Sequence, residues 1–403
     1  PMVGRDQELA LLLERWQQAA AGEGQAVLLV GEAGVGKTRI SRALLDKLSP
    51  KMPIRIRYQC SPYHTGSALW PAIQQLEHAA RLAADDPLET RLDKLERALG
   101  SESATDTAAL IANLLGLDGT SRYGAVELAP TVLRARTLQA LVRQLLALAA
   151  TRPVLLLIED AHWADPTTLE LIEAWLDAIA TAPVLLVITS RPDNQPVLAA
   201  HPHVTRFSLN RLSRAGIEAI VARLGGDRLP PATLDAIIAR TDGVPLYVEE
   251  LTKAVLETGE TAIPASLHDS LMARLDRTPE VKEVAQIAAC IGREFDYGLL
   301  AAIAEQSAGE LTGALDKLTT AELIFRRGTP PEASYTFQHA LVRDAAYESL
   351  LKSRRQALHL RLLAALEADG TASPELLAQH AQAAGDVARA VSWWRQAGEA
   401  AVG

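Results

Sequence analysis

The chain has 403 residues, of which 48% are hydrophobic and 22% are charged, and its formal net charge at pH 7 is −9. This composition is that of a soluble globular protein with sizeable cores, and at roughly 150 residues per domain the length predicts two to three domains. The acidic balance argues against broad, charge-driven binding to nucleic acid.

Cysteine usage and hydropathy give a first expectation of where the protein works. The two cysteines, Cys60 and Cys290, lie far apart and have no CxxC partner or His/Cys ligand spacing, which predicts a reduced, cytoplasmic protein with both thiols in its cores. The most apolar stretch, 141–158, is broken by arginines and a proline, so we expect no membrane span and no signal peptide. Because the chain starts at Pro1 without an initiator Met and ends at Gly403 inside a helical pattern, we expect it to be part of a longer protein.

The N-terminal part alternates between amphipathic helices and short apolar strands. In chain order the pattern predicts a helix over 5–21, a buried strand ending at Gly31, a helix from Lys37 to about Leu48 and a strand over 53–60. Residues from about 61 to 150 then form an unusually long helical insertion.

Further apolar runs complete this pattern. They start at Pro153 and Pro183, where the missing proline donor costs least, and a helix from Pro166 to about Ala180 separates them. A fifth strand follows over 203–210. Almost fully apolar strands that alternate with helices predict a parallel sheet covered by helices on both faces, an α/β fold.

The sequence that follows the first domain, which we place at 1–211, is mainly helical. Residues 212–262 are predicted as a lid of short helices around TDGVPLYVEE. Residues 263–352 are predicted as helices followed by a hairpin, AELIFRRG, TPPE and ASYTFQH, which suggests a winged-helix domain. Residues 353–403 are helical again, and their small-residue and aromatic spacing predicts the start of tetratricopeptide-like repeats.

The stretch GEAGVGKT, residues 31–38, matches G-x-x-x-x-G-K-[ST] between a predicted strand and a predicted helix. Its glycines allow a backbone path that turns successive N–H groups inward around an anion. Lys37 would reach the β- and γ-phosphates, and the Thr38 hydroxyl would bind Mg²⁺. A glycine-rich surface turn is the alternative, but the strand-loop-helix context favours a nucleoside triphosphate site. The predicted contacts are Gly31, Gly34, Val35, Gly36, Lys37, Thr38 and Arg39.

The run VLLLIED, residues 154–160, ends in two carboxylates at the carboxyl edge of a predicted strand, where ligands of open α/β sheets bind. Mg²⁺ has to be held from a neighbouring strand and the attacking water has to be oriented. We expect Glu159 to act on the Mg²⁺ shell and Asp160 to polarise the water; a strand that ends in solvated acids is the alternative. The commoner order is Asp then Glu, so the reversed order predicts slow turnover.

The strand PVLLVITSR ends in polar residues at the same edge. Thr189 could sense the γ-phosphate, and Arg191 could compensate phosphate charge. His162 and Trp163 are expected to pack, and Asp165 is expected to cap a helix that starts at Pro166. We expect no metal site beyond the Mg²⁺ of the nucleotide.

Several stretches together resemble a known family. VGRDQEL (3–9), GEAGVGKT, LLLIEDAHWADP, LLVITSRP, TDGVPLYVEELTKAVLE (241–257) and YTFQHALVRDAAYESLL (335–351) are similar to the signal-transduction ATPases with numerous domains, the STAND class. Within it they look most like the AAA-type module that follows the catalytic domain of bacterial class III adenylate/guanylate cyclases, and CSPYH and IPASLHDSLMARLDR strengthen that match.

The resemblance implies an ATP/ADP-controlled switch: an α/β P-loop NTPase with a five-stranded parallel sheet of the ASCE type, a lid, a winged helix and tetratricopeptide-like repeats. It also implies further nucleotide contacts. Those are Val3, Gly4 and Arg5 beside the adenine, Gly243 and Pro245 of the lid against base and sugar, and His339 on the ADP β-phosphate. The chain departs from the family where Ala340 replaces an acid and where the connector 257–264 is short.

The leading hypothesis is a slowly hydrolysing, Mg²⁺-dependent ATPase that regulates a cyclase or other output domain outside this chain. We expect protein partners to bind through the helical repeats and ATP binding to favour a homo-oligomer. One alternative is the ATPase module of a large transcription activator, and another is a non-hydrolysing scaffold with structural ADP. A basic patch that could face DNA is more simply a solvated surface; it comprises Arg326, Arg327, Arg354 and Arg355.

Overall fold

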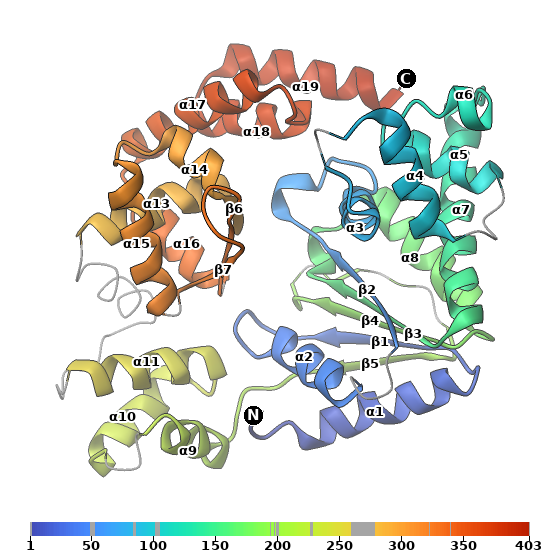
Figure 1. Ribbon diagram of the computed structural model, residues 1–403. Coiled ribbons are helices and arrows are strands. Elements are labelled where there is room, and N and C mark those ends of the chain that lie inside the picture. The colour runs from blue at the N-terminus through green and yellow to red at the C-terminus, as the bar shows by residue number, and fades with distance from the viewer. Residues whose placement is uncertain are drawn as a thin grey trace. The chain divides into compact units, whose positions relative to one another are not determined.

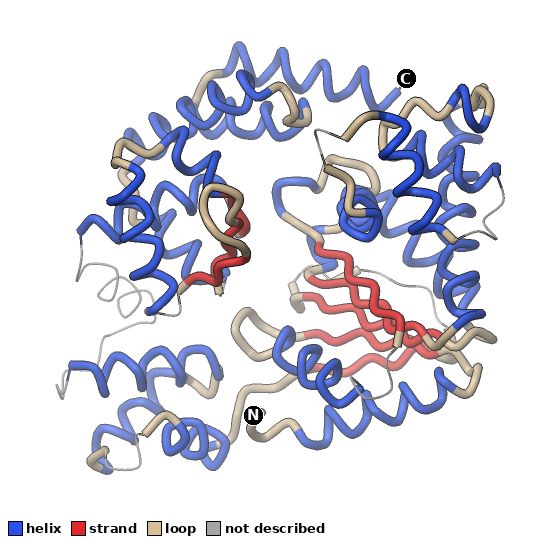
Figure 2. The backbone as a smooth tube through the Cα atoms, in the orientation of Figure 1, coloured by secondary structure: helices blue, strands red, loops and turns tan. Residues whose placement is uncertain are grey.

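The chain forms two compact units in the computed structural model (Figures 1 and 2). One comprises Pro1–Glu32, Gly36–Asn210 and Ala401–Gly403, and the other comprises Ala33–Val35 and Arg211–Ala400. The structure describes residues 2–48, 53–83, 86–100, 105–193, 195–196, 198, 201–225, 229–258, 279–321, 323–338 and 340–402.

A five-stranded parallel sheet with the order β2-β3-β4-β1-β5 is the centre of the first unit (Figure 2). Its strands are β1 (Gln25–Val30), β2 (Ile54–Gln59), β3 (Val154–Glu159), β4 (Val184–Ser190) and β5 (Val204–Ser208). The predicted α/β fold class is therefore confirmed. Strand β4 lies between β1 and the acidic strand β3.

Both faces of this sheet are buried. Alternate side chains such as Leu28 and Ile158 join a core cluster with Trp175 of helix α8 (Pro166–Ile179). Side chains that point the other way, such as Leu29, are buried as well, and α1 (Asp6–Ala20) contacts β1 and β4. A strand buried on both faces cannot alternate in polarity, which explains the continuous apolar runs in the sequence.

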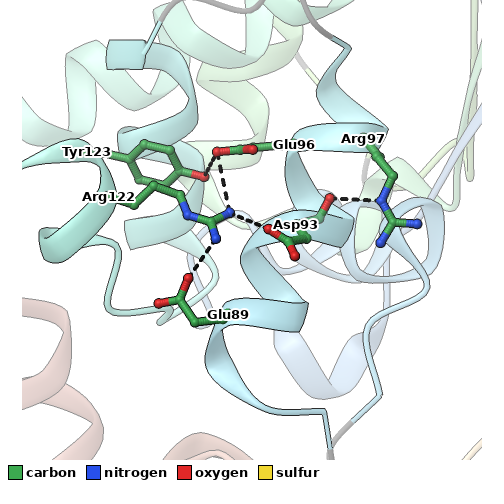
Figure 3. A network of polar contacts seen from close by, with 6 residues as sticks. All are labelled: Glu89, Asp93, Glu96, Arg97, Arg122 and Tyr123. Atoms are coloured by element: carbon green, nitrogen blue, oxygen red, sulfur yellow. Dashed lines mark hydrogen bonds and ion pairs between the residues drawn. The ribbon is translucent and has the colours of Figure 1, made fainter.

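The predicted helical insertion is confirmed between β2 and β3 (Figure 1). It comprises η2 (Pro62–His64), α3 (Trp70–Ala80), α4 (Leu88–Leu99), α5 (Thr105–Leu114), α6 (Thr120–Tyr123) and α7 (Pro130–Thr151). Arg122 of α6 joins carboxylates of α4: it donates to Glu89 at 2.6 Å and to Asp93 at 2.7 Å (Figure 3). The Tyr123 hydroxyl donates to Glu96 at 2.9 Å, so the short α6 is tied to α4 by a polar cluster.

In the second unit, helices α9 (Arg214–Arg223), α10 (Pro231–Thr241) and α11 (Pro245–Thr258) contact one another, and their role as a lid stays a prediction. Gly243, just before α11, has φ +73°. A Cβ there would lie 2.5 Å from the carbonyl oxygen of Leu212, whose N–H donates to the Gly243 carbonyl at 2.7 Å. Position 243 therefore requires glycine both for its backbone conformation and for space.

An antiparallel sheet with the order β6-β8-β7 follows in the second unit. The strands of this sheet and the helices around it are, in chain order, α13 (Pro279–Ile291), β6 (Glu294–Asp296), α14 (Tyr297–Ile303), α15 (Ala308–Thr320), β7 (Ile324–Arg327), β8 (Ser334–Phe337) and α16 (Ala340–Glu348). The predicted hairpin is confirmed as β7 and β8. Strand β6 was not predicted, because three residues are too few to show a period.

The last helices, α17 (Lys352–Asp369), α18 (Pro374–Ala384) and α19 (Val387–Val402), confirm the helical pattern after residue 353. Their buried side chains, such as Leu362 and Leu377, belong to the same core cluster as Phe337 of β8. The expected domain boundary near 352 is therefore not a boundary of the core. Within the described residues, no helix has the length and apolarity needed to cross a membrane.

Candidate nucleotide-binding site

The carboxyl ends of β1, β3 and β4 bring the predicted site residues of the first unit to one edge of the sheet. Val30 pairs with Ser190, and Ile158 pairs with Ile188, so the loop after β1 and the acids at the end of β3 flank the end of β4. Ligands of open parallel sheets bind at this edge, outside the ends of the strands.

The loop GEAGVGKT connects β1 to α2 (Lys37–Leu48) as the motif predicts. Gly34 and Gly36 have φ values of +79° and +105°, which side-chain-bearing residues rarely adopt. The Gly31 N–H donates to the Ser190 carbonyl at 3.1 Å, which anchors the start of the loop on β4. Val35 in the middle of the loop is buried.

Lys37 is buried at the first position of α2. Its ammonium donates to the Gly31 carbonyl at 2.6 Å and to the Glu32 carbonyl at 2.9 Å. Burial lowers the pKa of Lys37 to about 8; the charge of Asp160 opposes this shift and that of Arg191 adds to it. Asp160 and Arg191 therefore both lie near Lys37. Thr38 and Arg39 are exposed on the first turn of α2.

Glu159 is 5% exposed at the end of β3. Its Oε2 accepts a 2.7 Å hydrogen bond from Nε of Arg57, which also forms an ion pair with it. Arg57 lies on β2, whose Gln59 is in register with Glu159. The sequence interpretation missed Arg57 because the register of two parallel strands depends on their distant packing.

Asp160 leaves the strand in the left-handed conformation, with φ 56° and ψ 43°. Its N–H donates to the Thr189 hydroxyl at 3.0 Å, and its Oδ2 accepts from the Gln59 amide at 3.2 Å. The two acids therefore have different surroundings: the Glu159 carboxylate accepts from a guanidinium, whereas the Asp160 carboxylate accepts from the Gln59 amide and lies near Lys37.

His162 belongs to this group of charges, although the sequence suggested only packing. It is buried in the short helix η3 (Ala161–Trp163) that follows Asp160. Burial lowers the pKa of His162 to about 4; Asp160 opposes the shift, and Arg191 and Lys37 add to it. Its position two residues after the acid pair was the only signal in the sequence. The predicted helix cap next to it is confirmed, because Asp165 accepts from the first N–H groups of α8.

The oxygens available for a metal at this edge are the Thr38 hydroxyl and the two carboxylates. Mg²⁺ in nucleotide sites takes one or two protein oxygens, with water and phosphates as its other ligands, so these residues fit that ion. Within the part of the chain that the structure describes, three or more His, Cys, Asp or Glu residues are nowhere grouped to hold a metal. A site that shares its ligands with a nucleotide does not need such a group.

The remaining predicted contacts belong to the N-terminal segment and to the second unit. Arg5 is buried, and its guanidinium donates to Glu8 at 3.0 Å and to the carbonyl of Asn210 after β5. Val3 and Gly4, where φ is +66°, precede it. The roles of these residues at the adenine stay predictions.

The nucleotide contacts predicted in the second unit also stay predictions. Gly243 and Pro245 form the turn into α11, and their role at a nucleotide stays a prediction. His339 lies outside the described residues, as does most of the connector 257–264. The structure describes Ala340 as the first residue of α16.

Comparisons with known proteins agree with this geometry. Residues 1–188 match the family model described as AAA ATPase domain. The first unit has the α/β P-loop ATPase fold, and most of it is similar to AAA ATPase domains. An uncharacterized protein of Rhizobium meliloti (strain 1021) is 32% identical over 422 residues. That alignment covers 99% of this chain and 40% of the relative, so the chain spans less than half of that protein.

A solved structure supports the fold along most of the chain. It is the crystal structure of a Signal Transduction ATPase with Numerous Domains (STAND) protein with a tetratricopeptide repeat sensor, from Pyrococcus horikoshii. The TM-score is 0.55 at 15% sequence identity, over 95% of this chain and 48% of that chain. The P-loop domain and the helices after it are thus similar in fold to that structure.

Proposed function

We propose that this chain is the regulatory module of a multidomain signalling protein, which binds ATP with Mg²⁺ and hydrolyses it slowly. One observation carries the proposal: the sheet edge brings Lys37 of the phosphate loop within electrostatic reach of Asp160, whose partner acid Glu159 is bound by Arg57. A phosphate-binding lysine beside a carboxylate that can orient water is the arrangement that ATP hydrolysis requires.

Each residue at the edge has a distinct task in this proposal. The loop N–H groups and Lys37 bind the β- and γ-phosphates, and the Lys37 ammonium exchanges the Gly31 and Glu32 carbonyls for phosphate oxygens. Mg²⁺, when bound with the nucleotide, offsets the charge of the phosphate oxygens. Thr38 and Glu159 would hold the ion, Glu159 through water. Asp160 accepts a hydrogen bond from the water that attacks the γ-phosphate, and Arg191 stabilises the developing charge.

Slow turnover is supported by both acids. Asp160 has a shorter side chain than the glutamate that commonly serves the attacking water, and the bond from Arg57 reduces the charge that Glu159 offers to a metal shell. A slow enzyme persists in its ATP-bound and ADP-bound states, as a switch requires. Differential contacts of the γ-phosphate in the two states would supply the free energy of switching.

The output of the switch lies outside this chain in our proposal. Gly243 and Pro245 of the lid and His339 contact the nucleotide, so exchange of ADP for ATP reorients the helices that follow. The helices α17–α19 bind protein partners as the start of a tetratricopeptide-like array, and the ATP-bound form associates with further copies. The controlled domain is an adenylate/guanylate cyclase, as the motif resemblance suggests.

Nucleotide binding and phosphate release test the proposal on the purified chain. Lys37→Ala should weaken ATP binding at least tenfold, whereas Lys47→Ala, exposed on the same helix, should leave it unchanged. Asp160→Asn should retain ATP and strongly slow phosphate release, and the matched control is Asp46→Asn on α2. Equal ATP affinity of Lys37→Ala and the parent would contradict the site. Equal phosphate release by Asp160→Asn and the parent would favour a non-hydrolysing scaffold, and many turnovers per second would contradict a slow switch.

A further inference from the structure

The main chain at Asp160 is held by a side chain at the point where β3 ends. The ladder between β3 and β4 runs from Val154 and Val184 to Ile158 and Ile188. Beyond it, the Asp160 N–H donates to the hydroxyl of Thr189 at 3.0 Å instead of to a carbonyl. Thr189 is 3% exposed, so this bond is shielded from water.

This bond coincides with an unfavourable backbone conformation. Asp160 has φ 56°, a conformation that is unfavourable for L-residues and is tolerated best by Gly, Asn and Asp. On the other side of the strand, the Cys60 N–H donates to the Glu159 carbonyl at 3.0 Å. The chain is therefore fixed on both sides where it turns out of the sheet, and the turn decides where the Asp160 carboxylate points.

Strand β4 also holds the phosphate loop. The carbonyl of Ser190 accepts from the Gly31 N–H at 3.1 Å, one residue after Thr189 binds Asp160. Thr189 and Ser190, which are consecutive in β4, thus hold Asp160 and the first residue of the phosphate loop, Gly31. Because both residues are almost fully buried, their spacing is set by β4 and not by mobile side chains.

We propose that Thr189 is a positioning residue, whose hydroxyl fixes the main chain of Asp160 and so sets the distance from its carboxylate to the phosphate loop. This inference rests on the proposed ATPase function. It replaces the expectation from the sequence that Thr189 senses the γ-phosphate. The proposed role requires a hydroxyl oxygen that can accept the hydrogen bond from the Asp160 N–H. Serine supplies such an oxygen, whereas valine has the same shape as threonine but no acceptor.

The first test separates rate from affinity. Thr189→Val should lower kcat roughly tenfold, the order expected for one lost hydrogen bond, and should leave the affinities for ADP and a non-hydrolysable ATP analogue unchanged. Thr189→Ser should restore kcat. Thr205→Val on β5, outside the site, is the matched control and should behave as the parent.

A double-variant cycle shows whether Thr189 acts through Asp160. In single-turnover reactions, Thr189→Val should cause no further loss in an Asp160→Asn background, since the carboxylate that it positions is already replaced. The inference would be overturned if the losses in rate from Thr189→Val and Asp160→Asn multiplied in the double variant. It would also be overturned if Thr189→Val weakened binding of the ATP analogue but not of ADP, because that result would show direct contact with the γ-phosphate.

Hydrogen exchange of peptides that contain Asp160 tests the bond without activity. Thr189→Val should speed exchange of this amide, and Thr189→Ser should keep it slow; equal exchange in all three proteins would overturn the inference.

Failure of the proposed function would give a different set of results. In that case the parent releases no phosphate, or Lys37→Ala binds ATP as the parent does, whatever the exchange rates are.

Discussion

Arg57 and Glu159 are joined across neighbouring strands by a 2.7 Å hydrogen bond from Arg57 Nε to Glu159 Oε2. The Arg57 side chain is 55% exposed, whereas that of Glu159 is 7% exposed. The carboxylate that we expect to serve Mg²⁺ is therefore compensated by a cation that can move into solvent. Metal binding and the bond to Arg57 compete for the same negative charge.

We predict that Arg57→Gln lowers the free Mg²⁺ concentration needed for half-maximal ATP binding. The expected change is roughly two- to fivefold, because a pair with one exposed partner is worth under about 1 kcal/mol. Titrating Mg²⁺ against bound fluorescent ATP measures it. Arg55→Gln, exposed on the same strand, is the control. An unchanged Mg²⁺ requirement would show that Arg57 and the ion do not compete.

Gly243→Ala should destabilise the second unit. The added Cβ meets the Leu212 carbonyl oxygen at 2.5 Å, and the backbone at 243 has φ +73°, so we expect a loss of about 1–3 kcal/mol in the free energy of unfolding. Urea unfolding measures this loss. Gly298→Ala, in α14 with open space around it, should cause no loss. Equal stability of the two variants would contradict the steric account.

His359 of α17 should make the second unit less stable in acid. It is 2% exposed, and its ring nitrogens lie 3.0 Å from the Tyr347 hydroxyl and 3.1 Å from Nδ1 of His380. Burial, with the charges of Arg343 and Arg355, lowers the pKa of His359 from 6.5 to about 4. Because the folded-state pKa lies below the unfolded value, this stability is present above pH 6.5 and is lost as the pH falls towards 4, on the order of 3 kcal/mol in total.

Urea unfolding between pH 7 and pH 4 checks this prediction. His359→Gln removes the titrating group, so its free energy of unfolding should fall less over that range than that of the parent. His78→Gln, exposed on α3, should keep the pH dependence of the parent. If His359→Gln lost as much stability in acid as the parent, another group would have to be responsible.

The polar cluster between α4 and α6 should stabilise the insertion only at low ionic strength. Arg122 pairs with exposed carboxylates, which salt screens (Figure 3). We expect Arg122→Gln to lower the melting temperature in low salt and to have little effect at about 1 M NaCl, where the Debye length is about 3 Å. Arg97→Gln, which loses only a bond to the Asp93 carbonyl, is the control. A loss of stability that did not depend on salt would indicate packing instead.

Much of the fold could be predicted because its signals are local. These signals are the glycines at 34 and 36, the apolar runs of β1, β3 and β4, and the helical periodicity around them. Each depends on residues that are only a few positions apart in the sequence. Strand β6 was missed for the same reason, since three residues carry too little pattern. The shared core of α13–α18 was missed because cores form between distant segments.

The sequence by itself determined the phosphate loop, the acid pair and the helix cap at Asp165, because each depends on residue types at fixed spacing. Only the tertiary structure decided that β4 lies between β1 and β3, that β2 is in register to bring Arg57 to Glu159, and that Thr189 holds Asp160 in a left-handed turn. Strand order and register follow from the burial of whole strand faces, which couples residues about a hundred positions apart and leaves no local pattern.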